Sequence, residues 1–117
     1  MEDNYAARYL NCTVVVETDR PLGSTHPEHG FHYPVNYGFI PNTIAPDGEA
    51  IDAYILGIFE PVKTYTGTCI AVIQRTSDED DKLVVAPDGI TFSDEQIRAL
   101  TDFQEKFFVS VIIRKKV

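Results

Sequence analysis

Short runs of β-branched and aromatic residues, separated by turn signals, fill most of this chain and limit what it can fold into. The strand-like runs are 11–18, 31–40, 51–58, 67–75, 82–86 and 109–113. Pro, Gly, Asn and Asp are concentrated between them, as expected for turns and loops. Because Pro34 and Gly38 interrupt the second run, we expect an irregular strand with a bend there. Several short strands of this kind are typical of a small β-barrel.

One stretch has a helical period instead. Ser93 is followed three residues later by Gln96, which predicts a capping box at a helix N-terminus. From there, apolar residues recur at steps of three or four as Ile97, Leu100, Phe103 and Phe107. We interpret this stripe, together with Phe108, as core packing. The sequence therefore predicts a mainly β (α+β) fold, a small barrel with one helix packed on it.

Length and charge restrict the function further. The 117 residues suit a single domain spanning 1–117, and no apolar run approaches the roughly 20 residues of a membrane helix. A formal net charge of −8 argues against nucleic acid or an anionic membrane as partner. The acidic start, Met1 to Tyr5, lacks the layout of a signal peptide. Cys12 and Cys69 lie in strand-like runs, so we expect buried free thiols in a reducing, cytoplasmic environment.

Three carboxylates lie within six residues, between a turn and an apolar strand. Asp47 and Glu49 would face the same side of an extended chain, and Gly48 could supply the bend that brings Asp52 to them. Asp52 stands in an otherwise apolar run, where an unpaired carboxylate is costly. A bound divalent cation would remove that cost. On this basis we expect Asp52→Asn to keep the fold, or even to stabilise the metal-free protein.

A second acidic run, 78–81, precedes Lys82. Such a run can simply be a solvated loop tip, but here it lies between strands expected to neighbour the first cluster. Two groups of hard oxygen ligands suit Mg²⁺ and a phosphate substrate that fills the remaining metal positions. The candidate cations near this site are Lys82, Arg20 and Arg75. The pattern therefore predicts metal-dependent chemistry on a phosphoanhydride.

Three segments carry a resemblance to a known family. They are the Tyr-Pro-x-Asn-Tyr-Gly motif in 33–40, the acidic motif in 47–53 and the Asp-Asp-Lys motif in 80–87. In this order and near this spacing, the sequence resembles the family I soluble inorganic pyrophosphatases over roughly residues 13–108. The resemblance implies an OB-like five-stranded barrel with a C-terminal helix, cytosolic location, Mg²⁺ dependence and homo-oligomers. It also implies a small-molecule substrate, pyrophosphate.

The resemblance implies a site residue by residue. The metal ligands would be Asp47, Asp52, Asp78, Asp80 and Glu17. In the acidic loop, Asp78 with Asp80 and Glu79 with Asp81 both remain open, and Asp80 is preferred because it keeps a two-residue step to Lys82. Glu49 stands where the family has its general base, and Tyr37 and Lys82 where it contacts phosphate. Tyr33 lies nearby, and Arg20 is a further candidate for substrate binding.

The sequence also departs from the family pattern. Glu49 replaces an Asp, the segment between Glu17 and Tyr33 is shortened, and Phe107-Phe108 replaces a Tyr-Lys pair. His26, His29 and His32 fall in the shortened segment, and we interpret them as solvated loop residues. The alternative is that His26 and His29, with Arg20, replace the family's charged residues that this segment lacks. Tyr33 and Tyr37 could be plain core aromatics and Lys82 a strand-edge charge. Two further functions stay open: hydrolysis of another phosphoanhydride or nucleotide, and non-catalytic binding of metal or phosphate.

Overall fold

Six strands and one α-helix form the part of the chain that the computed structural model describes, residues 4–115. They are β1 (Thr13–Arg20), β2 (Asn36–Ile40), β3 (Ile51–Ile55), β4 (Thr64–Arg75), β5 (Lys82–Ala86), α1 (Asp94–Glu105) and β6 (Ser110–Ile113), preceded by a 3-10 turn, Ala7–Tyr9. Residues 1–3, which begin the expected acidic start, and residues 116–117 lie outside the described residues. None of the described helices is long and apolar enough to cross a membrane.

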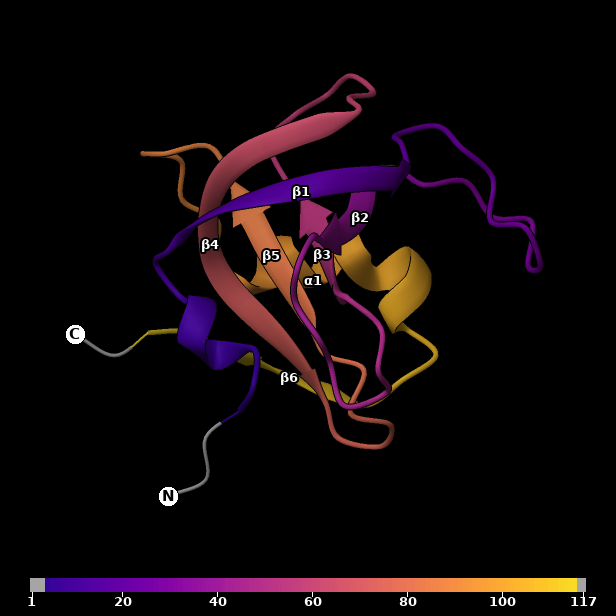
Figure 1. The fold of residues 1–117 in the computed structure, drawn as a ribbon. Coiled ribbons are helices and arrows are strands. Elements are labelled where there is room, and N and C mark those ends of the chain that lie inside the picture. Colours follow the sequence, from indigo (N-terminus) through magenta and orange to yellow (C-terminus); the bar gives the residue numbers. More distant parts are fainter. Residues whose placement is uncertain (1–3, 116–117) are drawn as a thin grey trace.

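The strands close into a barrel (Figure 1). Their order is β1-β2-β3-β5-β4, and β4 pairs with β1 again to complete the ring of five. Only β3 and β5 run parallel, and the other neighbours are antiparallel. β6 lies outside the ring, on the far part of β4. The prediction of a mainly β, OB-like five-stranded barrel with a C-terminal helix is therefore confirmed.

The long strand β4 joins three partners. It pairs with β1 through Thr64–Thr68, with β5 through Thr68–Ile73 and with β6 through Val72–Arg75. Its register shifts between Cys69 and Ala71, and an irregularity of this kind bends a strand. The sequence predicted this strand from residue 67, so it missed the first three residues, which include the exposed Thr64 and Thr66.

Two apolar clusters hold the molecule together, one inside the barrel and one beneath α1. On β3, Ala53 and Ile55 belong to the first cluster and Tyr54 to the second. Successive strand residues point to opposite faces, so both faces of these strands are covered. The same covering of both faces is seen in β5, in which all five residues are buried. Its run Leu-Val-Val-Ala is apolar without alternation for this reason.

Helix α1 begins as predicted. The Ser93 side chain accepts from the Gln96 backbone, and the Gln96 side chain accepts from the Ser93 backbone. The helix ends at Glu105, so the predicted stripe is only partly right. Ile97 is buried, whereas Phe107 follows the helix and is 62% exposed. The interpretation of Phe107 as core packing was wrong because the helix stops before this residue.

Two other local expectations need correction. Of the run 31–40, only Asn36–Ile40 is a strand, because the segment before it is held in a loop. Within that strand, a Cβ at Gly38 would overlap the Glu17 backbone of β1, so only glycine lets the two paired strands approach this closely. Both cysteines are free, but Cys12 is exposed and only Cys69 is buried. Cys12 differs from the prediction because β1 begins one residue after it, at Thr13.

Candidate active site

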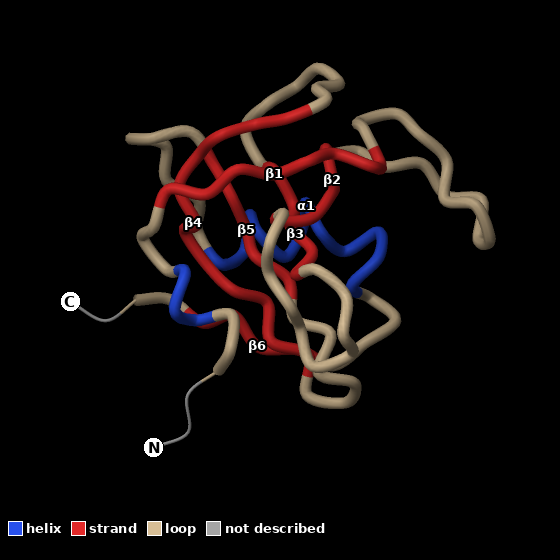
Figure 2. Tube along the Cα trace, viewed as in Figure 1, coloured by secondary structure: helices blue, strands red, loops and turns tan. Residues whose placement is uncertain are grey.

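The parallel pairing of β3 and β5 determines where the polar residues meet. Because the two strands run the same way, both begin at the same end of the barrel, where Asp52 lies opposite Lys82. The loop 41–50 leads into β3 and the acidic loop 76–81 leads into β5 (Figure 2). The sequence predicted that the strands on both sides of the acidic run neighbour the Asp52 strand. This is confirmed for β5, which pairs with β3, whereas β4 lies one strand further away.

Lys82 is the centre of this end of the barrel. Its side chain is 3% exposed, and its Nζ lies 2.7 Å from Asp52 Oδ2 and 3.0 Å from Asp80 Oδ1. A buried ammonium is stable only when paired, and the two carboxylates supply the pairing. The alternative that Lys82 is a strand-edge charge is wrong, since β5 is covered on both sides by β3 and β4.

Arg75, at the end of β4, forms a second buried ion-pair group. Its Nη2 and Nε lie 2.9 and 3.0 Å from the two carboxylate oxygens of Glu105 on α1. Its Nη1 lies 3.2 Å from Asp78 and 3.3 Å from Asp80. Burial by itself lowers the pKa of Arg75, but Glu105 and the two aspartates raise it above its usual value. Arg75 therefore stays charged and fixes the acidic loop against α1.

Three tyrosines lie beside these charges. Burial, followed by the negative charge of Asp52, raises the pKa of Tyr37 well above its usual value. Burial, followed by the charge of Glu105, does the same for the pKa of Tyr54, whose hydroxyl donates to Glu105 at 2.6 Å. Tyr33 donates to Gln104 at 3.0 Å. All three hydroxyls keep their protons near neutral pH and can act as hydrogen-bond donors.

A pocket of about 430 Å³ opens over this cluster. Its charged and polar lining comes from Tyr37, Asp52, Arg75, Asp80, Lys82 and Gln104. Its remaining lining is aromatic or imidazole: His26, His29, Phe31, Phe107 and Phe108. Four residues of the predicted site, Tyr37, Asp52, Asp80 and Lys82, therefore share one pocket. Asp78 reaches the same cluster through Arg75.

Five other predicted site residues do not line this pocket. Asp47 and Glu49 are exposed in the loop before β3, where Asp47 Oδ1 accepts from the Glu49 backbone at 2.9 Å. Glu17 is exposed on β1. Arg20 donates to the Asp19 carbonyl at 3.1 Å. Tyr33 is buried, and its ring stacks on that of His26 with the centroids 6.3 Å apart. Gly48 does adopt a positive φ of 87°, but the turn does not bring Asp47 and Glu49 to the pocket that Asp52 lines.

The carboxylates do not form a ready metal cage. Among residues 4–115, no group of three or more His, Cys, Asp or Glu side chains is arranged to hold a metal ion. Of the two alternatives for the acidic loop, Asp80 faces the pocket. Asp81 instead is 3% exposed and accepts from the Arg75 backbone at 3.0 Å, so it supports the loop.

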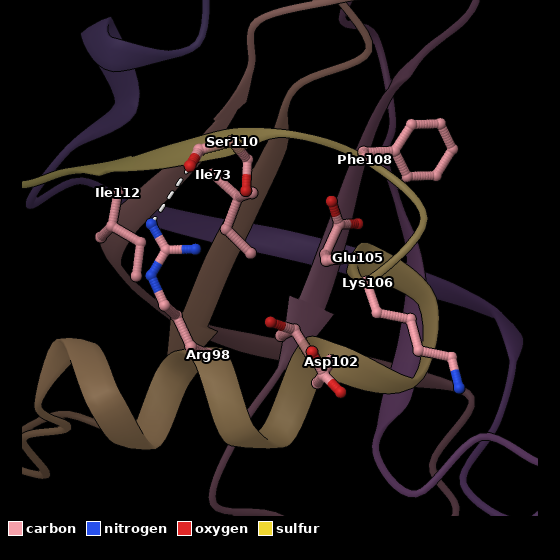
Figure 3. A pocket seen from close by; sticks show the side chains of 9 residues that line it. Ile73, Arg98, Asp102, Glu105, Lys106, Phe108, Ser110 and Ile112 are labelled. Atoms are coloured by element: carbon pink, nitrogen blue, oxygen red, sulfur yellow. Dashed lines mark hydrogen bonds between the residues drawn. The ribbon is translucent and has the colours of Figure 1, made fainter.

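Sequence reasoning missed Gln104 and Glu105. Figure 3 shows Glu105 projecting from the last turn of α1 in a smaller pocket of about 140 Å³, beside Phe108 and Lys106. The sequence does contain a signal for Glu105, because Ile97, Thr101 and Glu105 are spaced four apart and so share one buried face of the helix. A carboxylate on the buried face of a helix requires a cationic partner. That requirement points to Arg75 or Lys82.

Comparisons with known proteins point to one family. A family model described as inorganic pyrophosphatase matches residues 13–113. The inorganic pyrophosphatase of Ralstonia nicotianae is 35% identical over 82 residues, which cover 63% of this chain and 47% of that protein. The inorganic pyrophosphatase of a Nostoc species is 38% identical over 63 residues, or 48% of this chain and 36% of that protein. The matched segments thus span less than half of these relatives.

Solved structures agree in fold. The crystal structure of inorganic pyrophosphatase from Ehrlichia chaffeensis superposes with a TM-score of 0.66 at 21% identity, covering 84% of this chain and 82% of that one. The crystal structure of inorganic pyrophosphatase from Thermus thermophilus gives 0.59 at 18% identity, covering 86% of this chain and 80% of that one. At this level of identity, the likeness establishes the shared fold alone.

Proposed function

The chain belongs to the inorganic pyrophosphatase family, and from this premise we propose that its pocket hydrolyses inorganic pyrophosphate to two phosphates with Mg²⁺. One observation carries this proposal: Asp52 and Asp80 share the buried ammonium of Lys82 at the lining of a 430 Å³ pocket. A fixed ammonium beside two carboxylates offers a phosphate one cationic contact and offers a metal ion oxygen ligands.

The charge of the cluster supports a role for Mg²⁺. Two cations, Lys82 and Arg75, face four carboxylates, so the cluster is negative overall. An anionic substrate is more readily accepted when a divalent cation accompanies it. Mg²⁺ at phosphate sites is usually held by one or two carboxylates together with substrate oxygens. Asp52 and Asp80, each about a third exposed (32% and 35%), fit that shared arrangement.

Each lining residue has a role in this proposal. Lys82 binds a phosphate oxygen, and Tyr37, which keeps its proton, donates a hydrogen bond to another. When bound, Mg²⁺ would neutralise phosphate charge and make a water molecule more acidic. Arg75 holds Asp80 in the pocket and keeps the acidic loop in place. Glu49 as general base and Asp47, Asp78 and Glu17 as metal ligands remain predictions for mutagenesis, as does substrate binding by Tyr33 and Arg20.

Location and assembly are also proposals. The two free cysteines suit a reducing cytoplasm, and the overall charge disfavours nucleic acid or anionic membranes as partners. A homo-oligomer is supported by exposed apolar residues on and beside the edge strand β6, Val109 at 70% and Val111 at 46% exposed. The whole sequence, residues 1–117, would act as a single domain. Sedimentation of the purified protein measures its assembly state directly.

Phosphate release from pyrophosphate tests the function. The purified chain is assayed with Mg²⁺ and again with excess chelator. We expect release that depends on Mg²⁺ and stops with chelator. Absence of release under both conditions would reject pyrophosphate hydrolysis. Calorimetry with pyrophosphate and Mg²⁺ would then test the non-catalytic alternative, and phosphate release from nucleotides would test hydrolysis of another phosphoanhydride.

A further inference from the structure

One side of the pocket is built from flat rings. His26, His29 and Phe31 come from the loop between β1 and β2, and Phe107 and Phe108 follow α1. The His29 ring centroid lies 6.2 Å from that of Phe31, with planes 13° apart, and 6.5 Å from that of Phe107. Residues distant in sequence therefore form one aromatic surface beside the charged cluster.

Part of this surface is left uncovered. One face of Phe108 is covered, because the Arg75 guanidinium lies 3.6 Å from the centre of its ring. Phe107 has only the more distant Lys106 Nζ, 5.4 Å from its ring centre, and is 62% exposed although it lines the pocket. When a flat ligand group covers a large exposed aromatic ring at a pocket, the buried apolar area favours binding of the ligand. The free surface available to a ligand is thus made by His29, Phe31 and Phe107.

The size and charge of the pocket favour a ligand with two different ends. A volume of about 430 Å³ lies within the range of roughly 300–1,000 Å³ common for organic ligands. The only lining cations among the described residues, Arg75 and Lys82, are both already paired with carboxylates. Phosphate groups alone therefore find few free positive charges. A ring stacked on the aromatic surface would add binding energy that does not depend on charge.

We propose that the pocket accepts a nucleoside di- or triphosphate, with the base against His29, Phe31 and Phe107 and the terminal phosphate beside Lys82. A nucleotide unites a polyphosphate and a flat heterocycle in one molecule, matching the charged and the aromatic lining. This substrate class rests on the hydrolytic function proposed above. In the reaction, the oxygen of water bonds to the terminal phosphorus. The bond from that phosphorus to the bridging oxygen breaks, its electron pair leaves with the shortened nucleotide, and the proton of water passes to solvent.

The experiment compares substrates that differ only in the nucleoside. kcat/KM is measured with Mg²⁺ for ATP, for UTP and for inorganic tripolyphosphate, which has the phosphates but no base. We expect at least one nucleotide to exceed tripolyphosphate by roughly tenfold, the effect of one stacked base. Phe107→Ala should lower that nucleotide value by about tenfold and change the tripolyphosphate value by less than about twofold. Phe59→Ala, 84% exposed and outside the pocket lining, is the matched control and should alter neither value.

Two results would overturn the nucleotide subsite. One is equal kcat/KM for nucleotides and tripolyphosphate, and the other is an equal loss for both in Phe107→Ala. If no substrate is hydrolysed, pyrophosphate included, the proposed function fails but the subsite is still testable by calorimetry. ADP should then bind more tightly than inorganic pyrophosphate to the wild type, and Phe107→Ala should abolish the difference. No difference in the wild type rejects the subsite independently of catalysis.

Discussion

At the scale of single residues, Lys82 decides the character of the site. A lysine at the start of a fully buried strand would be costly if unpaired, and here Asp52 and Asp80 bind its Nζ together. The sequence analysis considered Asp52 as the costly group, relieved only by a metal. The structure reverses that relation, because Asp52 is 32% exposed and itself stabilises the buried ammonium. The expected effect of removing its charge changes accordingly.

Asp52→Asn should therefore destabilise the metal-free protein, contrary to the expectation from sequence. The ammonium of Lys82 keeps Asp80 but loses its shortest charged contact, at 2.7 Å. A charge-assisted hydrogen bond of this kind contributes about 1–3 kcal/mol, so we expect a loss of that order in the unfolding free energy. Urea unfolding measures it. Asp102→Asn, at an exposed position of α1, is the control and should leave stability unchanged. An unchanged or higher stability for Asp52→Asn would show that the pair is not formed.

Alkaline pH should weaken the fold through its tyrosines. Burial raises the pKa of Tyr5 to about 12 from its usual value of 10.0. Below pH 10 the Tyr5 hydroxyl is protonated in both the folded and the unfolded chain, so it causes no change. Above pH 10 the unfolded chain loses the proton first, and stability falls as pH rises toward 12. Tyr5→Phe should lose less stability than the wild type between these pH values. Identical curves from urea unfolding would contradict this account.

At the scale of elements, the barrel strands, the acidic loop and α1 meet through Arg75. Its guanidinium joins the end of β4 to Glu105 on the helix and to Asp78 and Asp80 in the loop. Hydrogen bonds from Tyr54 and Gln104 complete the buried group. Such networks are stable when every member has a partner and are strongly weakened when one is removed. The position of Asp80 in the pocket therefore depends on a helix residue.

Glu105→Gln tests this connection. The amide keeps the size of the carboxylate but removes the charge that pairs with Arg75 at 2.9 Å. We expect a loss of about 2 kcal/mol in unfolding free energy, the order for a hydrogen bond to a charged group. Pyrophosphate hydrolysis should also fall, since Arg75, one of the two cations that hold Asp80, loses its charged partner on α1. Arg75→Lys keeps the positive charge but replaces the guanidinium that pairs with Glu105, so it should show a similar loss of unfolding free energy. A Glu105→Gln variant with wild-type stability and hydrolysis rate would show that α1 does not support the site.

How far the sequence predicts this structure also depends on the element. Both ends of β5 and the start of α1 were predicted correctly, because a continuous apolar run and a capping box are local signals. The end of α1 was placed too late, since Phe107 continued the apolar spacing although the chain had left the helix. A turn was predicted before β3, but it was expected to bring Asp47 and Glu49 to Asp52, and neither of them lines the pocket. The geometry of this turn depends on backbone hydrogen bonds at Ala45 and Gly48, which residue types alone do not specify.

At the scale of the whole molecule, barrel closure produces the pocket. In the sheet closed through β1 and β4, β5 lies between β3 on one side and β4 on the other. The charged ends of these three strands, Asp52, Lys82 and Arg75, then lie at neighbouring positions. The pairing of the acidic loop with Arg75 and the role of Glu105 arise only in this folded arrangement. For that reason the sequence identified the motif residues but not the network that supports them.

The rate of pyrophosphate hydrolysis by Lys82→Met tests the central claim most directly. Methionine fills nearly the same volume without the ammonium, so Asp52 and Asp80 remain at the pocket while its buried cation is lost. With saturating Mg²⁺, we expect kcat/KM to fall by about 100-fold or more, as when a fixed charge in contact with a reacting group is removed. Lys63→Met, at an exposed position outside the pocket lining, should retain the wild-type rate. A folded Lys82→Met protein that hydrolyses pyrophosphate at the wild-type rate would contradict the assignment of this pocket as the active site.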